Sequence, residues 1–483
     1  MQPAKSINII RSFALVLLLT FQLACDSGSN SGVVTPSTNP LARTSMVGHW
    51  NHVAVNASGF DHTVTGAKEN AGPTKSSRAM AITHIAIHDA VQAIQQRYET
   101  YLPQEAAPAD SSVEAAIAQA AYDALVALYP SQKTTFDSEL ERDLAGIVDG
   151  VAKENGIAAG HRSAKLILAN RANDGADELS QSSPYKFSQS AGKWRVDPVN
   201  PTQQPLGPNW YKVKPFAIES ASQFRAPTPP EISSPQYAEA YAEVYRLGGD
   251  VITTPTDRTE NETNIGLFWA YDGTPSLCAP PRLYNQIVLQ LAYDQGVTDL
   301  GDLARLLALA NVSMADAGIT SWETKYFYNY WRPVTGIREA DAGTGPSGKG
   351  DNNPLTTGDV NWSPLGAPAS NLSANNFTPP FPAYVSGHAT FGGALFQTLR
   401  NYFGKDNIEF TFVSDELNGE TVDHEGNVRP FLPRTFKSLS EAEEENGQSR
   451  IYLGIHWSFD KTEGIVMGNN VANYTFAKLL KAK

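Results

Sequence analysis

The chain has 483 residues, of which 41% are apolar, and its formal net charge at pH 7 is −13. This length and apolar content are enough to bury one large or two ordinary domain cores, which excludes a disordered protein. The acidic balance lacks a long basic tract, which argues against a nucleic-acid-binding surface and restricts any anion site to a local pocket. Cys25 and Cys278 are the only cysteines, so a disulfide framework is excluded.

Residues 1–25 have the pattern of an export signal, because basic residues precede an apolar stretch too short for a comfortable membrane span. Ala24 directly before Cys25 resembles a bacterial lipoprotein cleavage site, which would leave a lipid on Cys25 and make residues 26–45 a flexible tether. Ordinary signal cleavage nearby is the alternative. We expect an exported protein, either periplasmic or an outer-membrane or cell-surface lipoprotein of a bacterium, that meets the membrane only through this lipid.

Helical spacing of apolar residues dominates the first half of the chain, and we assign residues 46–180 to an N-terminal helical domain. The segments with this spacing are 52–93, 113–128, 136–151 and 158–173. Residues 181–235 are rich in Pro, Ser, Gln and Trp and show little periodicity. We therefore expect an irregular connection there, and a domain divide.

Helical patterning returns in residues 236–483, which we assign to a C-terminal helical bundle. Its predicted helices are 237–247, 260–271, 283–295, 299–330, 389–402 and 464–480. Strand-like alternation is scarce throughout the chain. The sequence therefore predicts an all-α fold of two helical bundles.

Three short segments of the C-terminal half concentrate cationic and imidazole side chains. They are KYFYNYWRP at 325–333, SGH at 386–388 and SRIYLGIHWSFD at 449–460. Lys325 and Arg332 are seven residues apart on a predicted helix, hence two turns along one face, where both can reach one anion. Arg450 and His456 are six apart, so a turn between them is needed for both to point inward.

Ser386, Gly387 and His388 stand at a predicted helix N-terminus, which suits an anion because free N–H groups and the helix dipole face it. Gly387 allows close approach of the backbone, and Ser386 adds a hydroxyl donor. We predict one site for a tetrahedral or trigonal oxyanion, either vanadate or phosphate. Its residues are Lys325, Arg332, Ser386, Gly387, His388, Arg450 and His456.

The three segments resemble the signature shared by vanadium-dependent haloperoxidases and the type 2 phosphatidic acid phosphatases. Further stretches are similar to the soluble haloperoxidase branch, among them WNHVAV, MAITHIAIHDAV, FWAYDG and PPRLYNQI. The resemblance covers most of residues 48–480 and departs at Val385, where the signature often has proline. It implies a haloperoxidase-like fold, an active site in the C-terminal bundle, and vanadate as cofactor.

The resemblance also implies roles for the site residues. His456 would be the axial metal ligand, His388 the acid–base histidine, and Lys325 would polarise bound peroxide. The residues that would hold the vanadate oxygens are Lys325, Arg332, Ser386, Gly387 and Arg450. The implied enzyme oxidises bromide, iodide or chloride with hydrogen peroxide to hypohalous acid through peroxovanadate, and a small organic acceptor takes up the halogen.

Four further residues are candidates around this site. Trp322 and Phe381 match residues beside the halide site of chloroperoxidases, although plain aromatic core is an equal alternative. A buried guanidinium needs a carboxylate partner, for which Asp272 is the first candidate and Asp460 the second. Asp460 can instead cap the helix that follows it or orient His456 through a hydrogen bond.

Two other functions fit the same ligands. An acid phosphatase would use His456 as nucleophile and His388 to protonate the leaving oxygen, because phosphate and vanadate are near-isosteres. No apolar run after residue 25 reaches membrane-spanning length, and this, together with the haloperoxidase-like stretches outside the site, argues against it. A lipid-tethered protein that binds phosphate or vanadate without turnover is a third possibility, but it has no need of a second histidine.

His84 and His88 have the i, i+4 spacing of a helical metal site. No third ligand is apparent near them, and the surrounding residues 80–91 read as a buried helix. We therefore predict a structural role for both histidines.

Overall fold

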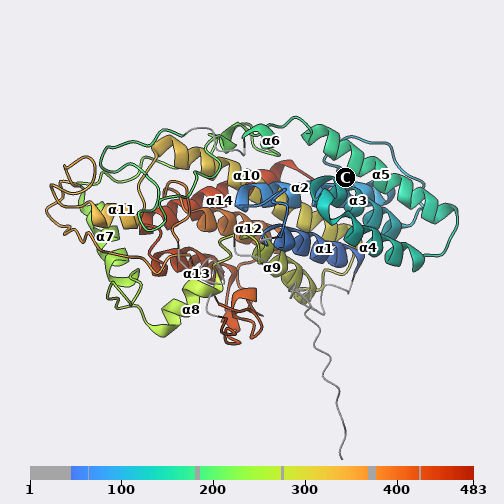
Figure 1. Cartoon of the computed structure of the whole chain (residues 1–483). Helices are drawn as coiled ribbons and strands as arrows, with labels where there is room; N and C mark the ends of the chain where they lie inside the picture. The colour runs from blue at the N-terminus through green and yellow to red at the C-terminus, as the bar shows by residue number, and fades with distance from the viewer. Residues whose placement is uncertain (1–44, 64, 180–184, 274–276, 368–376, 424–425) are drawn as a thin grey trace, which may run out of the picture. The chain divides into compact units, whose positions relative to one another are not determined.

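The computed structural model describes residues 45–483 except 64, 180–184, 274–276, 368–376 and 424–425. The predicted signal at 1–25 and all but the last residue of the predicted tether lie outside the described residues. The helices of the first half are α1 (Met46–Asp61), α2 (Pro73–Gln95), α3 (Val113–Leu128), α4 (Lys133–Ala145), α5 (Val151–Arg171) and α6 (Ala176–Leu179). Those of the second half are α7 (Pro235–Leu247), α8 (Glu260–Phe268), α9 (Pro281–Asp294), α10 (Leu300–Tyr328), α11 (Pro333–Arg338), α12 (Gly387–Phe403), α13 (Leu439–Tyr452) and α14 (Ser458–Lys478) (Figure 1).

The predicted all-α class is confirmed. Within the described residues, the regular strands are β1 (Phe410–Phe412) and β2 (Arg434–Phe436), which form one short antiparallel ladder. Short 3-10 turns occur at Pro130–Gln132, Trp210–Lys212 and Asp415–Leu417. Such small pieces of sheet have no core of their own, so helix packing stabilises the fold.

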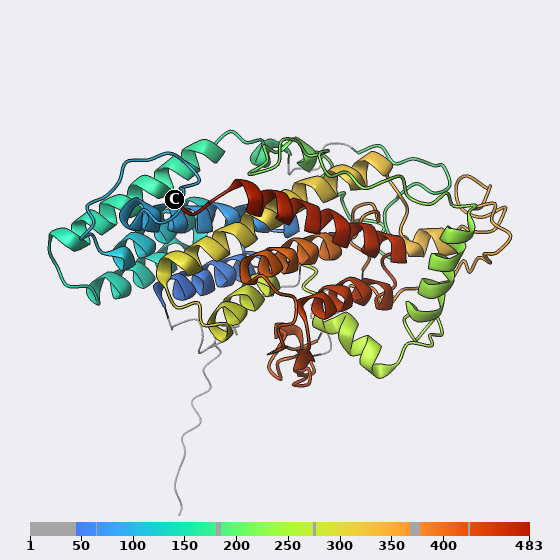
Figure 2. The ribbon, with the colours of Figure 1, turned by 180° about the vertical axis from the view of Figure 1, so that it is seen from behind.

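Helix α10 is the central element of the packing. It contacts α2 from the first half of the chain and both α12 and α14 from the second. Figure 2 shows α14, in red, running along α12 and α10. Residues 306–325 of α10 are buried on every face, as expected of a helix enclosed by other helices.

One core of buried apolar side chains extends from Val47 in α1 to Val471 in α14. The predicted divide at residues 181–235 therefore separates two stretches of sequence that share a hydrophobic core. Asp316 of α10 contributes to this union, because its carboxylate accepts the backbone N–H groups of residues 216–218 in the irregular connection. These hydrogen bonds attach the irregular connection to α10.

Several helix bounds differ from the prediction, and the predicted segment 52–93 covers parts of both α1 and α2. The segment predicted at 136–151 belongs to two helices, because α4 ends at Ala145 and Gly150, with φ of 141°, precedes α5. Helix α13 was not predicted at all, since its sequence is rich in Glu and poor in apolar residues. The signal that indicates it is the Ser438 cap three residues before Glu441, whose backbone N–H bonds the Ser438 hydroxyl.

Among the described residues, no helix combines the length and the apolar character needed to cross a bilayer.

Candidate active site

The predicted site residues come together at the ends of helices. Lys325 lies in the last turn of α10, Ser386 caps the N-terminus of α12, and Arg450 lies in the last turn of α13. Arg332 precedes α11, and His456 lies in the short turn between α13 and α14. Helix ends carry unpaired backbone groups and partial charges, which makes their meeting point suitable for a charged ligand.

The prediction that Lys325 and Arg332 share one helical face was wrong. Helix α10 ends at Tyr328 because Asn329 adopts a left-handed conformation with φ of 53°. Arg332 is extended, as expected of a residue before proline, and is the N-cap of α11. The two side chains still reach one loop, since Arg332 Nε donates to the Phe381 carbonyl at 2.9 Å and Lys325 bonds the carbonyls that follow it.

His456 is held by its neighbour Asp460. His456 Nδ1 lies 2.8 Å from Asp460 Oδ2, which also accepts the Trp457 backbone N–H at 3.0 Å. We assign the proton of the first bond to Nδ1, so that the lone pair is on Nε2. Burial, followed by the charges of Arg332 and Lys325, lowers the pKa of His456 well below its usual value and keeps the ring neutral. Its Nε2 can therefore act as a metal ligand or a nucleophile.

Two buried guanidinium groups supply donors without protein acceptors. Arg332 and Arg450 are each 1% exposed. Arg332 Nη1 donates to His456 Nε2 at 2.9 Å, and Arg450 Nη2 donates to both oxygens of Asp272 at 2.7 and 2.6 Å. Within the described part of the chain, Arg332 Nη2, Arg450 Nε and Arg450 Nη1 have no partner. A buried unpaired donor costs about 1–3 kcal/mol, which an oxyanion beside His456 would recover.

Lys325 forms hydrogen bonds with the loop that precedes α12. Its Nζ donates to the carbonyls of Pro382, Ala383 and Val385 at 3.0, 3.1 and 2.5 Å. Burial, followed by the charge of Arg332, lowers the pKa of Lys325 well below its usual value. The three donated hydrogen bonds nevertheless require the ammonium form, because a neutral amine has only two N–H groups to donate. The ammonium therefore contributes positive charge to the site, but Lys325 does not line the cavity that adjoins the site.

The N-terminus of α12 presents His388 to the site. The Ser386 hydroxyl accepts the Ala389 N–H at 3.4 Å and so caps the helix. His388 Nε2 donates to the Ala270 carbonyl at 2.6 Å and lies 3.9 Å from Asp272 Oδ1. Burial, followed by the charge of Arg450, lowers the pKa of His388 to about 3. The imidazole is therefore neutral at pH 7, and its Nδ1 carries the lone pair.

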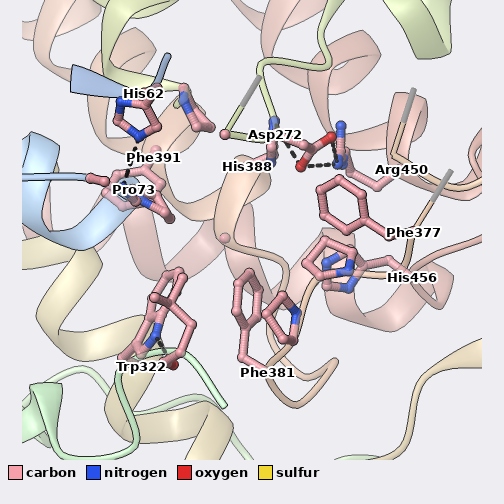
Figure 3. A pocket seen from close by; sticks show the side chains of 18 of the residues that line it. His62, Pro73, Asp272, Trp322, Phe377, Phe381, His388, Phe391, Arg450 and His456 are labelled. Atoms are coloured by element: carbon pink, nitrogen blue, oxygen red, sulfur yellow. Dashed lines mark hydrogen bonds and ion pairs between the residues drawn. The ribbon is translucent and has the colours of Figure 1, made fainter. Parts of the chain in front are cut away.

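A cavity of about 250 Å³ adjoins these groups. His388, Arg450 and His456 line it together with Trp322 and Phe381, and Figure 3 shows Trp322 and Phe381 below the two histidines and Arg450. The centroids of these two rings are 4.7 Å apart. Gly387 also lines the cavity, where a Cβ would lie 3.5 Å from the Trp322 ring.

Sequence reasoning missed several residues of the cavity wall. Phe391 lies one helical turn beyond His388, and this i, i+3 spacing was a signal that could have found it. His62, Leu206 and Phe377 also line the cavity, but they come from distant segments and carry no motif. Only packing brings them to the site.

His84 and His88 lie outside the site. His84 Nε2 bonds Asn51 Oδ1 and His88 Nε2 bonds the Glu99 carbonyl, both at 3.0 Å. The described residues contain no group of three or more His, Cys, Asp or Glu side chains arranged to hold a metal. Each histidine thus has a hydrogen-bond partner inside the fold, and its structural role stays a prediction.

Comparisons with known proteins extend over most of the chain. The vanadium chloroperoxidase N-terminal domain matches residues 41–209, and the VCPO second helical-bundle domain matches residues 305–482. A vanadium chloroperoxidase from Curvularia inaequalis is 31% identical over 513 residues, which cover 89% of this chain and 82% of that protein.

Two solved structures share the fold. A bacterial vanadium-dependent iodoperoxidase has a TM-score of 0.71 and 24% identity and covers 91% of this chain and 98% of its own. A holo-type bacterial vanadium-dependent chloroperoxidase has a TM-score of 0.64 and 15% identity and covers 84% of this chain and 91% of its own. With the relative that is 31% identical, the predicted family is confirmed, and the chain belongs to the vanadium-dependent haloperoxidases.

Proposed function

We propose that this protein oxidises halide ions with hydrogen peroxide and that vanadate is its resident cofactor. Hydrogen peroxide, a halide ion and a proton would give hypohalous acid and water. The observation that carries the proposal is the set of unpaired guanidinium N–H groups of Arg332 and Arg450 beside the neutral Nε2 of His456. One imidazole ligand and several charged donors suit a hard, oxygen-rich anion.

In this function, His456 Nε2 would hold the metal, and Arg332 and Arg450 would neutralise the oxygens. Bound vanadate supplies Lewis acidity that activates peroxide without a change of its own redox state. His388 accepts a proton from incoming hydrogen peroxide at Nδ1, the ring nitrogen that Ala270 does not use. Asp272 balances the charge of Arg450 and keeps a negative group near His388.

The Trp322 and Phe381 rings are the proposed wall of the halide position. Both rings line the cavity, and Arg332 Cζ lies 5.0 Å from the Phe381 centroid. An apolar wall beside positive charge favours a weakly hydrated anion. The relatives include a chloroperoxidase and an iodoperoxidase, so kinetics with chloride, bromide and iodide must rank the halides for this chain.

The decisive assay uses protein freed of bound anions. We expect bleaching of monochlorodimedone only when vanadate, hydrogen peroxide and bromide are all present, and inhibition by excess phosphate, which competes for the same donors. The neutral His456 backed by Asp460 also suits a phosphatase nucleophile. Hydrolysis of a phosphate ester, inhibited by vanadate and unaccompanied by halide oxidation, would establish that function instead.

We also propose that Cys25 carries a lipid and that the protein is exported. The support is the sequence pattern of residues 1–25. We expect the native protein to sediment with membranes and Cys25→Ser to be recovered in the soluble periplasmic fraction. Equal sedimentation of both proteins would count against the anchor.

A further inference from the structure

The cavity continues beyond the anion-binding groups into a part with aromatic and apolar walls. We propose that this part binds the organic acceptor, a neutral or anionic electron-rich aromatic compound of one or two rings, so that the halogen is transferred inside the protein. The inference rests on the proposed function and names the substrate class of the same site. A cavity of about 250 Å³ is close to the lower limit of small-molecule sites.

Three aromatic rings build the proposed acceptor wall. The Trp322 centroid lies 4.7 Å from that of Phe381 and 6.4 Å from that of Phe391, and the ring pairs are tilted by 51° and 50°. All three rings line the cavity, and Figure 3 shows His62 and Pro73 on the side away from His456. Such a wall offers edge and face contacts to a planar ring, which are worth about 0.5–1.5 kcal/mol per pair beyond burial.

We call the part of the cavity lining at Leu206 the outer wall, and hydrogen bonds hold it in place. Leu206, which lines the cavity, donates its backbone N–H to the Pro380 carbonyl at 2.9 Å. The Leu206 carbonyl accepts Trp322 Nε1 at 3.1 Å and the Tyr326 hydroxyl at 2.7 Å. These bonds hold the Leu206 backbone in place, so this wall is preformed, which reduces the entropic cost of binding.

His62 adds a flat surface without free polar groups. Its Nδ1 bonds the Ser58 carbonyl at 2.7 Å, and its Nε2 accepts the Gly72 N–H at 2.8 Å. Because both nitrogens are engaged, His62 contributes its ring and does not require a hydrogen-bonding ligand. This is appropriate for an apolar occupant.

The charged residues that line the cavity disfavour a cationic organic acceptor. Lys68 is exposed and Arg450 is buried, and both line the cavity, whereas the Asp272 carboxylate is already paired with Arg450. A phenolate or carboxylate on the acceptor is compatible with Lys68, but an ammonium group is repelled.

The transfer step balances without a further reagent. Hypohalous acid, which the proposed function supplies, gives its halogen to a ring carbon as the halogen–oxygen bond breaks and its electron pair stays on oxygen. The proton lost from that carbon joins the hydroxide to form water. The ring carbon is oxidised by two electrons, and the halogen returns to the halide oxidation level in the product.

The first test measures binding without turnover. Equilibrium dialysis of 2-naphthol against vanadate-free protein should show saturable binding of one molecule per chain. We expect 2-naphthoate to displace it and 2-naphthylmethylammonium to displace it at least tenfold less well. Absence of saturable binding, or equal displacement by the cation, would overturn the assignment of this ligand class.

The second test changes the outer wall. Leu206→Arg should weaken 2-naphthol binding at least tenfold, and Leu206→Ala, which preserves the backbone contacts, should weaken it several-fold. Leu355→Arg is the matched control, because Leu355 is 67% exposed and does not line the cavity, so it should bind as the unaltered protein does. Binding by Leu206→Arg equal to that of the control would overturn the proposal.

Product analysis separates halogenation in the cavity from halogenation in solution. With vanadate, peroxide and bromide, the unaltered protein should give a distribution of brominated naphthols different from that of reagent hypobromous acid, and Leu206→Arg should approach the reagent distribution. Identical distributions for the unaltered protein and the reagent would overturn the inference. Triiodide formation from iodide needs no organic acceptor, so its failure would refute the proposed function independently of the dialysis result.

Discussion

His456 Nδ1 donates to Asp460 Oδ2 across 2.8 Å, four residues along the chain. Both side chains are buried, and Oδ2 also accepts the Trp457 N–H. The carboxylate therefore fixes both the orientation and the tautomer of the imidazole, and it directs the Nε2 lone pair toward Arg332 and the anion position. The metal-binding capacity of His456 depends on this neighbour.

Replacing Asp460 with Asn should weaken vanadate binding. The amide can donate to Nδ1 and so favour the tautomer with a proton on Nε2, and we expect a loss of affinity of about 10–100-fold. Vanadate titration of activity and isothermal calorimetry would measure it. Asp89→Asn is the control, since Asp89 is a buried carboxylate that accepts the Tyr101 and Leu102 N–H groups instead. Equal affinities of the two variants would contradict the role of Asp460.

Replacing Asp272 with Asn should destabilise the protein and make its stability depend more strongly on bound vanadate. The change leaves the buried Arg450 charge uncompensated, at a cost of about 3 kcal/mol in the free energy of unfolding. Vanadate should then raise the melting temperature of the variant more than that of the unaltered protein. Asp406→Asn breaks a more exposed pair with Arg400 and should cost about 0–1 kcal/mol. Equal stabilisation by vanadate would show that the Asp272 charge does not act on the site.

His388→Ala should abolish turnover and leave vanadate affinity within a few-fold of normal. His388 is neutral at pH 7 and is assigned to proton transfer, which contributes about 10²–10⁴-fold to rate. Steady-state kinetics beside vanadate calorimetry separates the two effects. His161→Ala, at a side chain that is 56% exposed, should change neither. Undiminished turnover in His388→Ala would remove this histidine from the mechanism.

His84 should contribute to instability in acid. Burial lowers its pKa to about 3, so the native state leaves it neutral while the unfolded chain protonates it near pH 6.5. Stability is therefore lost as the pH falls below 6.5, by about 1.4 kcal/mol per pH unit for this group. His84→Gln, which can keep the bond to Asn51, should show a shallower loss of unfolding free energy between pH 6.5 and 4.5. Parallel profiles would contradict the buried neutral state.

The fold was largely predictable because helix formation leaves a local pattern. Apolar spacing gave the bounds of α3 at Val113–Leu128 without error and placed α7 within two residues of Pro235–Leu247. The same reasoning placed the end of α10 at residue 330 instead of Tyr328. The pattern of aromatic residues continues past Asn329, although the left-handed backbone of this residue ends the helix. It also missed α13, whose polar surface hides the pattern.

By itself, the sequence determined the helical class and the residue types that could bind an oxyanion, since periodicity and residue type are local properties. Only the tertiary structure decided which donors remain unpaired. Arg450 meets Asp272, 178 residues away, through one nitrogen and keeps Nε and Nη1 for an anion. The acceptor wall was decided in the same way, because packing brings Leu206 and Phe391 from distant segments to line one cavity, which no spacing along the chain encodes.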